Sequence, residues 1–286
     1  MEIEPVKGLP APGTPGLFWL GQAGFWIETG RHRILIDPYL SDSLARKYAG
    51  KKHPHRRMMP PPVTVEALPR PDIVLVTHAH TDHMDPDTLG PLAKRFPDLV
   101  FVVPRAREAI ARARIGVGAG LILADADEML QPLPGLSVQV FPAAHETLER
   151  DGAGRHKFLG YGLSADGLRL FHSGDCVPFE GLAERLRGFD PQILLLPVNG
   201  RDAQRFADGI PGNFTLDEAL ALARPYPYLI PHHFGLFDFN TIDPGEIDAA
   251  ALRADGRPRV LRPKPGVGLS VVRARSASDE PARSRT

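Results

Sequence analysis

Short runs of apolar residues, separated by glycine, proline and polar turn residues, recur along most of the chain. Most of these runs are rich in valine, isoleucine, leucine and phenylalanine, a pattern that is typical of buried β-strands. The runs that predict strands cover residues 17–27, 33–36, 73–77, 99–103, 121–123, 136–141, 159–163, 168–172, 193–198 and 228–230.

Helical stretches lie between these runs. Asp85 and Pro86 predict an N-cap followed by a proline at the first helical position. The sequence from Thr215 to Glu218 has the form of a capping box, in which two side chains satisfy free amide groups at the start of a helix. The predicted helices cover about 85–96, 105–115, 179–187 and 219–224.

The predicted strands come in runs and the helices in groups, so the two do not alternate strictly. Each half of the chain, before about residue 150 and after about residue 160, contains several strands and at least two helices. This order predicts an α/β fold in which two β layers are covered by helices on both outer faces. We expect one domain over 1–274 and a disordered tail over 275–286, where the residues are small, polar and charged.

The strongest chemical signal lies at 77–83, directly after a predicted buried strand, and contains three histidines and one aspartate within six positions. Imidazole and carboxylate groups are preferred ligands of zinc, manganese and iron. His78 and His80 point to the same side of an extended segment, because side chains alternate along it. Asp82 and His83 come just before a helix cap, where the chain turns and can face a second ion. A solvated loop that is rich in histidine is the alternative interpretation.

The spacing of these residues resembles the HxHxDH signature of the metallo-β-lactamase superfamily. This resemblance implies a four-layer αββα sandwich and three further ligands, each after a later apolar run. His145 and Asp175 stand at such positions, and the last ligand is either His232 or His233. We favour His233, because it aligns with the ligand of the similar proteins, and His232 would then line the pocket.

The ligand assignment is likewise what the resemblance implies. One metal ion would be bound by His78, His80 and His145, the other by Asp82, His83 and His233, and Asp175 would bridge the two. Asp37, at the end of an early strand, would support the ligands through a hydrogen bond. The cofactors implied are two divalent metal ions, with zinc or manganese favoured and iron also compatible with the ligand set.

Further stretches resemble the L-ascorbate-6-phosphate lactonase-like branch of this superfamily. The resemblance runs from about residue 17 to residue 245, and the Asn-Gly-Arg-Asp sequence at 199–202 is its most specific piece. Cys176 departs from the branch, which usually has serine or threonine after the bridging aspartate. The stretches that carry the resemblance are 19–24, 36–41, 172–175, 196–202, 212–215 and 231–237.

Residues that would bind the substrate are predicted from their chemistry. Asn199, Arg201 and Asp202 offer an amide, a donor fork and an acceptor at a strand end, which suits recognition of hydroxyl or phosphate groups. A salt bridge that braces the loop explains them equally well. Arg57, in the irregular basic segment 46–62, would meet an anionic group, although a solvated loop is the more ordinary interpretation.

Composition narrows the class of protein. The chain has 34 basic and 34 acidic residues, and this balance argues against nucleic-acid or membrane partners. Its single cysteine excludes an internal disulfide and fits a reducing compartment. The sequence shows neither a signal peptide nor an apolar run that could cross a membrane, so we expect a cytoplasmic protein, which could form a homo-oligomer.

Together these features predict a metal-dependent hydrolase. We expect metal-bound hydroxide to attack the carbonyl group of a lactone or ester in a small anionic or polyhydroxy substrate. Asp82 would orient the hydroxide and transfer its proton. Two alternatives are a phosphodiesterase or phospholipase of the same fold and a metal-binding scaffold or sensor without turnover.

Overall fold

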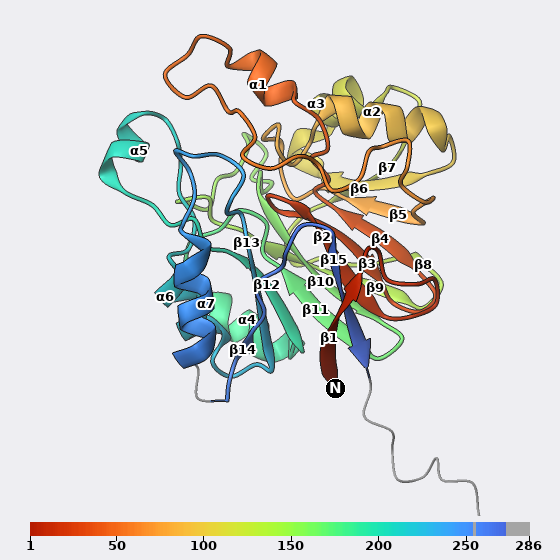
Figure 1. Ribbon diagram of the computed structural model, residues 1–286. Helices are drawn as coiled ribbons and strands as arrows, with labels where there is room; N and C mark the ends of the chain where they lie inside the picture. The colour runs from red at the N-terminus through yellow and green to blue at the C-terminus, as the bar shows by residue number, and fades with distance from the viewer. Residues whose placement is uncertain (254–255, 273–286) are drawn as a thin grey trace, which may run out of the picture.

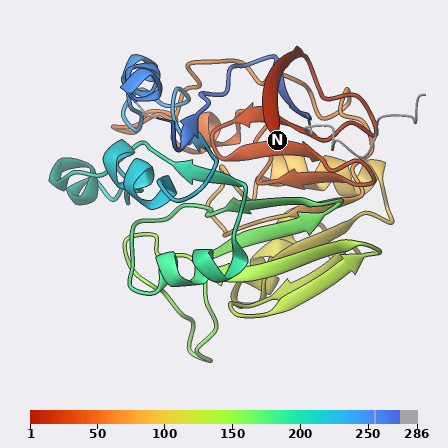
Figure 2. The same cartoon turned by 90° about the horizontal axis from the view of Figure 1, so that it is seen from below.

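A computed structural model describes residues 1–253 and 256–272 (Figure 1). The tail predicted at 275–286 lies outside the described residues. Two β-sheets pack face to face, and Figure 2 shows their strands stacked one above the other.

The first sheet contains eight strands and is antiparallel on one side and parallel on the other. Its last strand in sequence, β15, lies between β1 and β2, with Glu2 opposite Val272. The order is β1 (Glu2–Lys7), β15 (Val267–Val272), β2 (Gly16–Gly21), β3 (Gly24–Glu28), β4 (Arg33–Ile36), β5 (Ile73–Leu75), β6 (Val100–Pro104) and β7 (Gly120–Ala124).

The second sheet contains seven strands, of which β14 to β11 are parallel and β11 to β8 antiparallel neighbours. Its order is β14 (Arg259–Val260), β13 (Tyr228–His232), β12 (Ile193–Pro197), β11 (Leu168–His172), β10 (Leu159–Ala165), β9 (Leu136–Pro142) and β8 (Met129–Leu133).

Helices cover both outer faces of the sandwich. Figure 1 shows α2 and α3 on one side and α4, α6 and α7 on the other. The helices are α1 (Ser43–Lys47), α2 (Pro86–Arg95), α3 (Glu108–Ile115), α4 (Leu182–Phe189), α5 (Ala203–Ala207), α6 (Leu216–Ala223) and α7 (Pro244–Arg253), with a short 3₁₀ helix η1 (Arg105–Arg107) before α3. None of the helices in the described ranges is long and apolar enough to cross a membrane.

Alternation along the strands explains the layers. In β5, Ile73 and Leu75 pack into the core between the sheets, whereas Val74 belongs to a second cluster with Leu89 of α2 and Ala111 of α3. One strand therefore serves two apolar layers because successive side chains point to opposite faces. This arrangement confirms the predicted four-layer αββα sandwich.

The predicted capping box at 215–218 is confirmed, whereas the single strand predicted at 17–27 is wrong. The capping box is present, because Thr215 accepts a hydrogen bond from the Glu218 amide and Glu218 accepts one from the Thr215 amide. The run 17–27, predicted as one strand, is divided into β2 and β3. Gln22 has a positive φ of 50° there, and this left-handed conformation turns the chain back into a hairpin.

Candidate metal centre

The predicted site residues follow the carboxyl ends of strands in both sheets. β4 and β5 are parallel neighbours, and β9 runs in the same direction as β11, β12 and β13. Carboxyl ends of strands that run in the same direction lie at one edge of a sheet, where α/β proteins commonly bind ligands. The loops after these strands therefore bring residues from both halves of the chain to one place.

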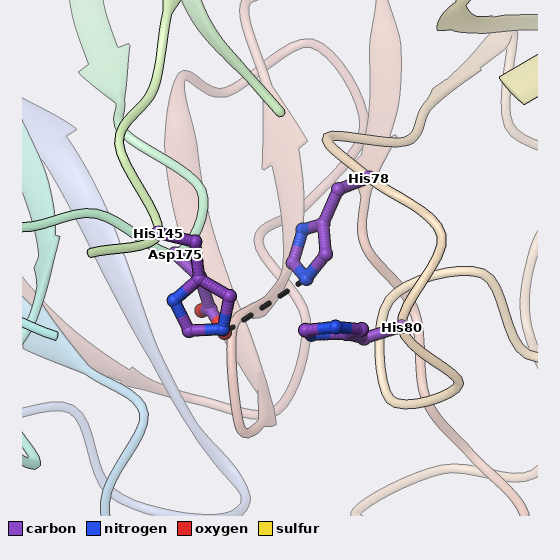
Figure 3. A group of neighbouring side chains, drawn as sticks. All are labelled: His78, His80, His145 and Asp175. Atoms are coloured by element: carbon purple, nitrogen blue, oxygen red, sulfur yellow. Dashed lines mark ion pairs between the residues drawn. The ribbon is translucent and has the colours of Figure 1, made fainter. Parts of the chain in front are cut away.

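The first group of side chains consists of His78, His80, His145 and Asp175, whose ligand atoms lie within 4.8 Å of one another. Figure 3 shows His78 and His80, which lie on one loop, converging with His145 and Asp175 from other loops. Nε2 of His145 lies 3.6 Å from Oδ2 of Asp175, and Nε2 of His78 lies 3.9 Å from the same oxygen. These donors therefore surround one small volume.

Asp82, His83 and His233 form a second group with ligand atoms at the same spacing. Asp175 also adjoins this group. Its Oδ1 lies 3.3 Å from Nε2 of His83, and its Oδ2 lies 3.3 Å from Nε2 of His233. The structure thus brings together all seven side chains that the sequence predicts as ligands, and the Asp175 carboxylate faces both groups.

The two neighbouring histidines at the end of β13 have different surroundings. His233 has a positive φ of 61°, and its amide donates to the carbonyl of Gln22, so that its ring turns toward Asp175. His232 is fully buried and stacks on His172, with ring centroids 4.6 Å apart. The structure places His233 in the cluster and His232 beneath it, away from the cleft.

Asp37 fixes the orientation of His83. Its Oδ2 lies 2.7 Å from Nδ1 of His83 and also accepts a hydrogen bond from the Thr77 hydroxyl at 2.6 Å. A carboxylate on one ring nitrogen directs the other nitrogen toward the site and increases its basicity. Burial alone would lower the pKa of His83, but Asp175, Asp37 and Asp82 together raise it well above its usual value.

Other members of the cluster are held in the charge state that metal binding requires. Burial lowers the pKa of His145 to about 4 and that of His78 well below its usual value, so both rings are neutral at pH 7. Burial opposes ionisation of Asp175, but His233 and His83 hold its pKa well below the usual range. Neutral imidazoles and an ionised carboxylate are the ligand forms of these groups.

Unsatisfied polar atoms indicate what the cluster lacks. Nε2 of His78, Nε2 of His83 and Oδ1 of Asp175 are buried and have no hydrogen-bond partner among the described residues. Each such group costs about 1–3 kcal/mol when it is left unpaired. Divalent cations held by the two groups would satisfy all three atoms, so the residues present fit a metal centre.

Gln22 is a member of the site that sequence reasoning missed. Its Nε2 donates to Oδ2 of Asp82 at 2.8 Å and lies 3.0 Å from Nε2 of His233. The hairpin turn between β2 and β3 carries this side chain into the cluster. The stretch 19–24 resembles the lactonase-like branch, and this was the only available signal for a role there.

A cleft of about 670 Å³ opens above the cluster, and His80, Asp82, His145, Asp175 and His233 lie in its floor. Its outer wall comes from α1 with the loop that follows, from residues 208–211 and from residues 237–240. Figure 1 shows α1 and α5 extending beyond the strands on this side of the molecule. The cleft gives a small molecule direct access to the cluster.

Three of the predicted substrate residues are engaged with other protein groups. Arg201 forms two hydrogen bonds of 2.6 Å with the Glu218 carboxylate. Asp202 caps α5 and pairs with Arg205. The Arg57 guanidinium donates to the carbonyl oxygens of Tyr39, Ser41 and Met59. None of these three side chains lines the cleft above the cluster. Each one stabilises the loop in which it lies.

Asn199 is buried behind the cleft. Its amide donates to Oδ1 of Asn240 at 2.7 Å, and its Oδ1 accepts from the amide of Asn213 at 3.0 Å. Asn240 itself lines the cleft, so Asn199 is connected to the cleft through that side chain.

Comparison with known proteins agrees with this geometry. Residues 32–234 match the family described as "Beta-lactamase superfamily domain". The chain belongs to this superfamily. The crystal structure of the metallo-beta-lactamase fold protein YhfI from Bacillus subtilis superposes with a TM-score of 0.59 at 16% identity, covering 93% of this chain and 98% of that one. This superposition confirms the metallo-β-lactamase fold.

Two curated relatives of this superfamily member are named as enzymes. A metal-dependent hydrolase of Polynucleobacter asymbioticus is 28% identical over 253 residues, which are 80% of this chain and 78% of that protein. The N-acyl-phosphatidylethanolamine-hydrolyzing phospholipase D 1 of Caenorhabditis elegans is 25% identical over 206 residues, 67% of this chain and 56% of that one. The resemblance to the lactonase-like branch stays a prediction.

Proposed function

We propose that this protein is a metal-dependent hydrolase that cleaves a lactone or ester of a small anionic molecule with the help of two divalent cations. The position of the Asp175 carboxylate between two groups of histidines carries this proposal. The first cation would be held by His78, His80 and His145, the second by Asp82, His83 and His233, and Asp175 would contact both. Divalent cations in such sites polarise carbonyl oxygens and acidify water.

Asp82 is the residue best placed to move a proton. It lies in the floor of the cleft, where a substrate would sit. Burial opposes its ionisation, but His83 and His233 lower its pKa, so it is a carboxylate at neutral pH. The Gln22 amide fixes one carboxylate oxygen, and a carboxylate held in this way can orient a water molecule and accept its proton.

Two neighbouring groups orient predicted ligands, and the one nearby thiol is unsuited to act as a nucleophile. Asp37 holds His83, and the carbonyl of Gly212 lies 3.1 Å from Nδ1 of His145 and can orient that ring. Cys176 follows Asp175 but is buried, and burial raises the pKa of its thiol to about 12. A protonated, inaccessible thiol cannot attack a substrate, so hydrolysis would use water.

The test combines elemental analysis of the purified protein with a hydrolysis screen on the same sample. We expect close to two equivalents of zinc, manganese or iron per chain, together with lactone or ester hydrolysis that chelation removes and added metal restores. One equivalent would support a single-ion enzyme instead. A protein that binds no metal after reconstitution would contradict the proposal.

Phosphodiester hydrolysis is the second candidate, favoured by the similarity to the phospholipase D of Caenorhabditis elegans. The same cluster could act on phosphorus in place of a carbonyl carbon. Bis-p-nitrophenyl phosphate assayed beside a panel of lactones and aryl esters separates the two. Phosphodiester cleavage that is faster by orders of magnitude would favour this candidate, and metal binding without turnover of either class would favour a scaffold or sensor.

A further inference from the structure

The outer wall of the cleft contains five neighbouring aromatic rings. Tyr48 stacks on His55, with centroids 4.1 Å apart, and His55 meets Phe239 edge to face at 4.7 Å. Phe237 stacks on Phe239 at 5.9 Å, and His53 lies 4.7 Å from Phe239. All five side chains line the cleft. We call these residues, Tyr48, His53, His55, Phe237 and Phe239, the ring wall.

The ring wall presents apolar surface to the cleft. Burial lowers the pKa of His55, so this ring is neutral at pH 7 and acts as an aromatic surface. His53 is hydrogen-bonded away to Oδ2 of Asp208 at 3.1 Å. Aromatic side chains in offset or edge-to-face arrangements accept a further ring readily, because their faces and edges carry complementary partial charges. The wall is therefore suited to a planar apolar group.

Positive charge stands beside the ring wall. Lys47 and Lys51 line the cleft, are exposed, and have no acidic partner among the described residues. Lys52 is different, because Asp208 neutralises it through two contacts of 2.7 Å. Nζ of Lys47 lies 5.2 Å from the centre of the Tyr48 ring, so a free cation and the ring wall are immediate neighbours.

The ring wall and the free lysines beside it argue against a sugar-like substrate. Polyhydroxy molecules are held by many directional donors and acceptors, and the residues predicted for that purpose are occupied elsewhere: Arg201 by Glu218 and Asp202 by Arg205. What the cleft offers in their place is aromatic area with free ammonium groups at its rim.

We propose that the substrate joins an aryl group, packed on the ring wall, to a carboxylate or phosphate that Lys47 and Lys51 bind. This inference rests on the proposed hydrolase function, because it assigns the substrate class of the same cleft. The aryl group would lie on the wall, while the scissile ester or lactone reaches the floor at Asp82 and His233.

Binding of three probes to the metal-loaded protein tests the inference by calorimetry. The probes are 2-naphthoate, which has both features, 2-naphthol, which has only the ring, and sorbitol 6-phosphate, which has only the anion and hydroxyl groups. We expect 2-naphthoate to bind at least about tenfold more tightly than either of the others, because two exposed ion pairs add to ring burial. Sorbitol 6-phosphate binding as tightly as 2-naphthoate would overturn the inference.

Variants locate the two subsites. The double substitution K47A/K51A should weaken 2-naphthoate about tenfold and leave 2-naphthol unchanged. Phe239→Ala should weaken both naphthalene probes. Lys94→Ala, an exposed lysine on α2 away from the cleft, is the matched control and should change neither. An unchanged affinity of K47A/K51A for 2-naphthoate would mean that the carboxylate binds elsewhere and would refute the role of the lysines.

A hydrolysis assay separates this inference from the proposed function. The substrates are 6-acetoxy-2-naphthoate and 2-naphthyl acetate, which differ only in the carboxylate. Metal-dependent hydrolysis of both at equal kcat/KM would uphold the ester hydrolysis of the proposed function and refute the preference for anions. If neither ester nor any lactone is hydrolysed, the proposed function fails, while the binding data still decide whether the cleft selects anionic aryl compounds.

Discussion

The floor and the outer wall of the cleft are built in different ways. The floor consists of side chains at the ends of strands, most of them buried and oriented by contacts such as that between His145 and the carbonyl of Gly212. The wall consists of loops, and its cations are exposed. Strand ends hold groups at fixed distances, as catalysis requires, whereas loops tolerate change. We infer that the floor determines the reaction and the wall determines the substrate.

Asp175→Asn tests the floor most severely. An amide in place of this carboxylate removes the negative charge that faces both histidine groups, so we expect loss of bound metal and of all measurable hydrolysis with the fold retained. Elemental analysis, kcat/KM and circular dichroism measure the three quantities. Cys176→Ser, a nearly isosteric change of the adjacent buried residue, should keep metal and activity. Full activity of Asp175→Asn would remove the basis of the proposed site.

Asp37→Asn tests how the ligands are held in place, without replacing a predicted ligand. His83 loses the carboxylate that orients its ring, and we expect metal affinity or activity to fall by about 10–100-fold. Competition with a chromogenic chelator measures the affinity. Thr77→Val removes only the hydroxyl that binds the same carboxylate, so its smaller effect provides a graded comparison. An unaltered affinity in Asp37→Asn would show that packing alone orients His83.

Metal uptake should release protons. The pKa of His83 is raised well above its usual value in the metal-free protein, so this ring is protonated at pH 7 and a cation must displace its proton. Affinity should therefore fall as the pH falls. Calorimetry in buffers of different ionisation enthalpy should show fewer protons released per chain by Asp37→Asn than by the parent protein, because this variant loses one of the three carboxylates that raise the pKa of His83. Equal proton release would contradict the charge state assigned to His83.

Asp208→Asn should have the smallest effect, because it acts only on the wall. Asp208 binds Lys52 and His53. Hydrogen bonds with these two side chains lower the pKa of Asp208 to about 2, against the smaller opposing effect of desolvation. We expect the loop after α1 to become more mobile, KM to rise a few-fold and kcat to stay the same. Hydrogen exchange of residues 48–59 and steady-state kinetics measure these changes. A large fall in kcat would mean that wall and floor are coupled.

The contrast between floor and wall also explains what the sequence could predict. Each ligand follows an apolar run, which is a local pattern, and the resemblance of residues 77–83 to the superfamily signature indicated which of the later runs to search for ligands. The ring wall joins Tyr48 and His55 to Phe237 and Phe239, residues far apart along the chain. Their meeting depends on the paths of two loops, which no local pattern specifies.

Arg57 illustrates the same limit for a charged residue. A basic loop predicts an exposed guanidinium. In the structure the Arg57 guanidinium instead points inward, donates to three carbonyl oxygens and lies over the Tyr39 ring. Buried carbonyl groups need donors, and the nearest available donor satisfies them. Gln22 was missed for a related reason, since its position depends on a hairpin turn inside what the hydrophobic pattern predicts as a single strand.

The position of β15 has a consequence for the order in which the molecule assembles. This strand lies between β1 and β2, so β1 has no neighbour in its sheet until β15, more than 250 residues later in the sequence, has been made. Closing so long a loop is entropically costly and slow. We therefore expect β1 to stay unpaired while the strands that carry the histidines are already complete, and a late step of folding to bring β1 and β15 together.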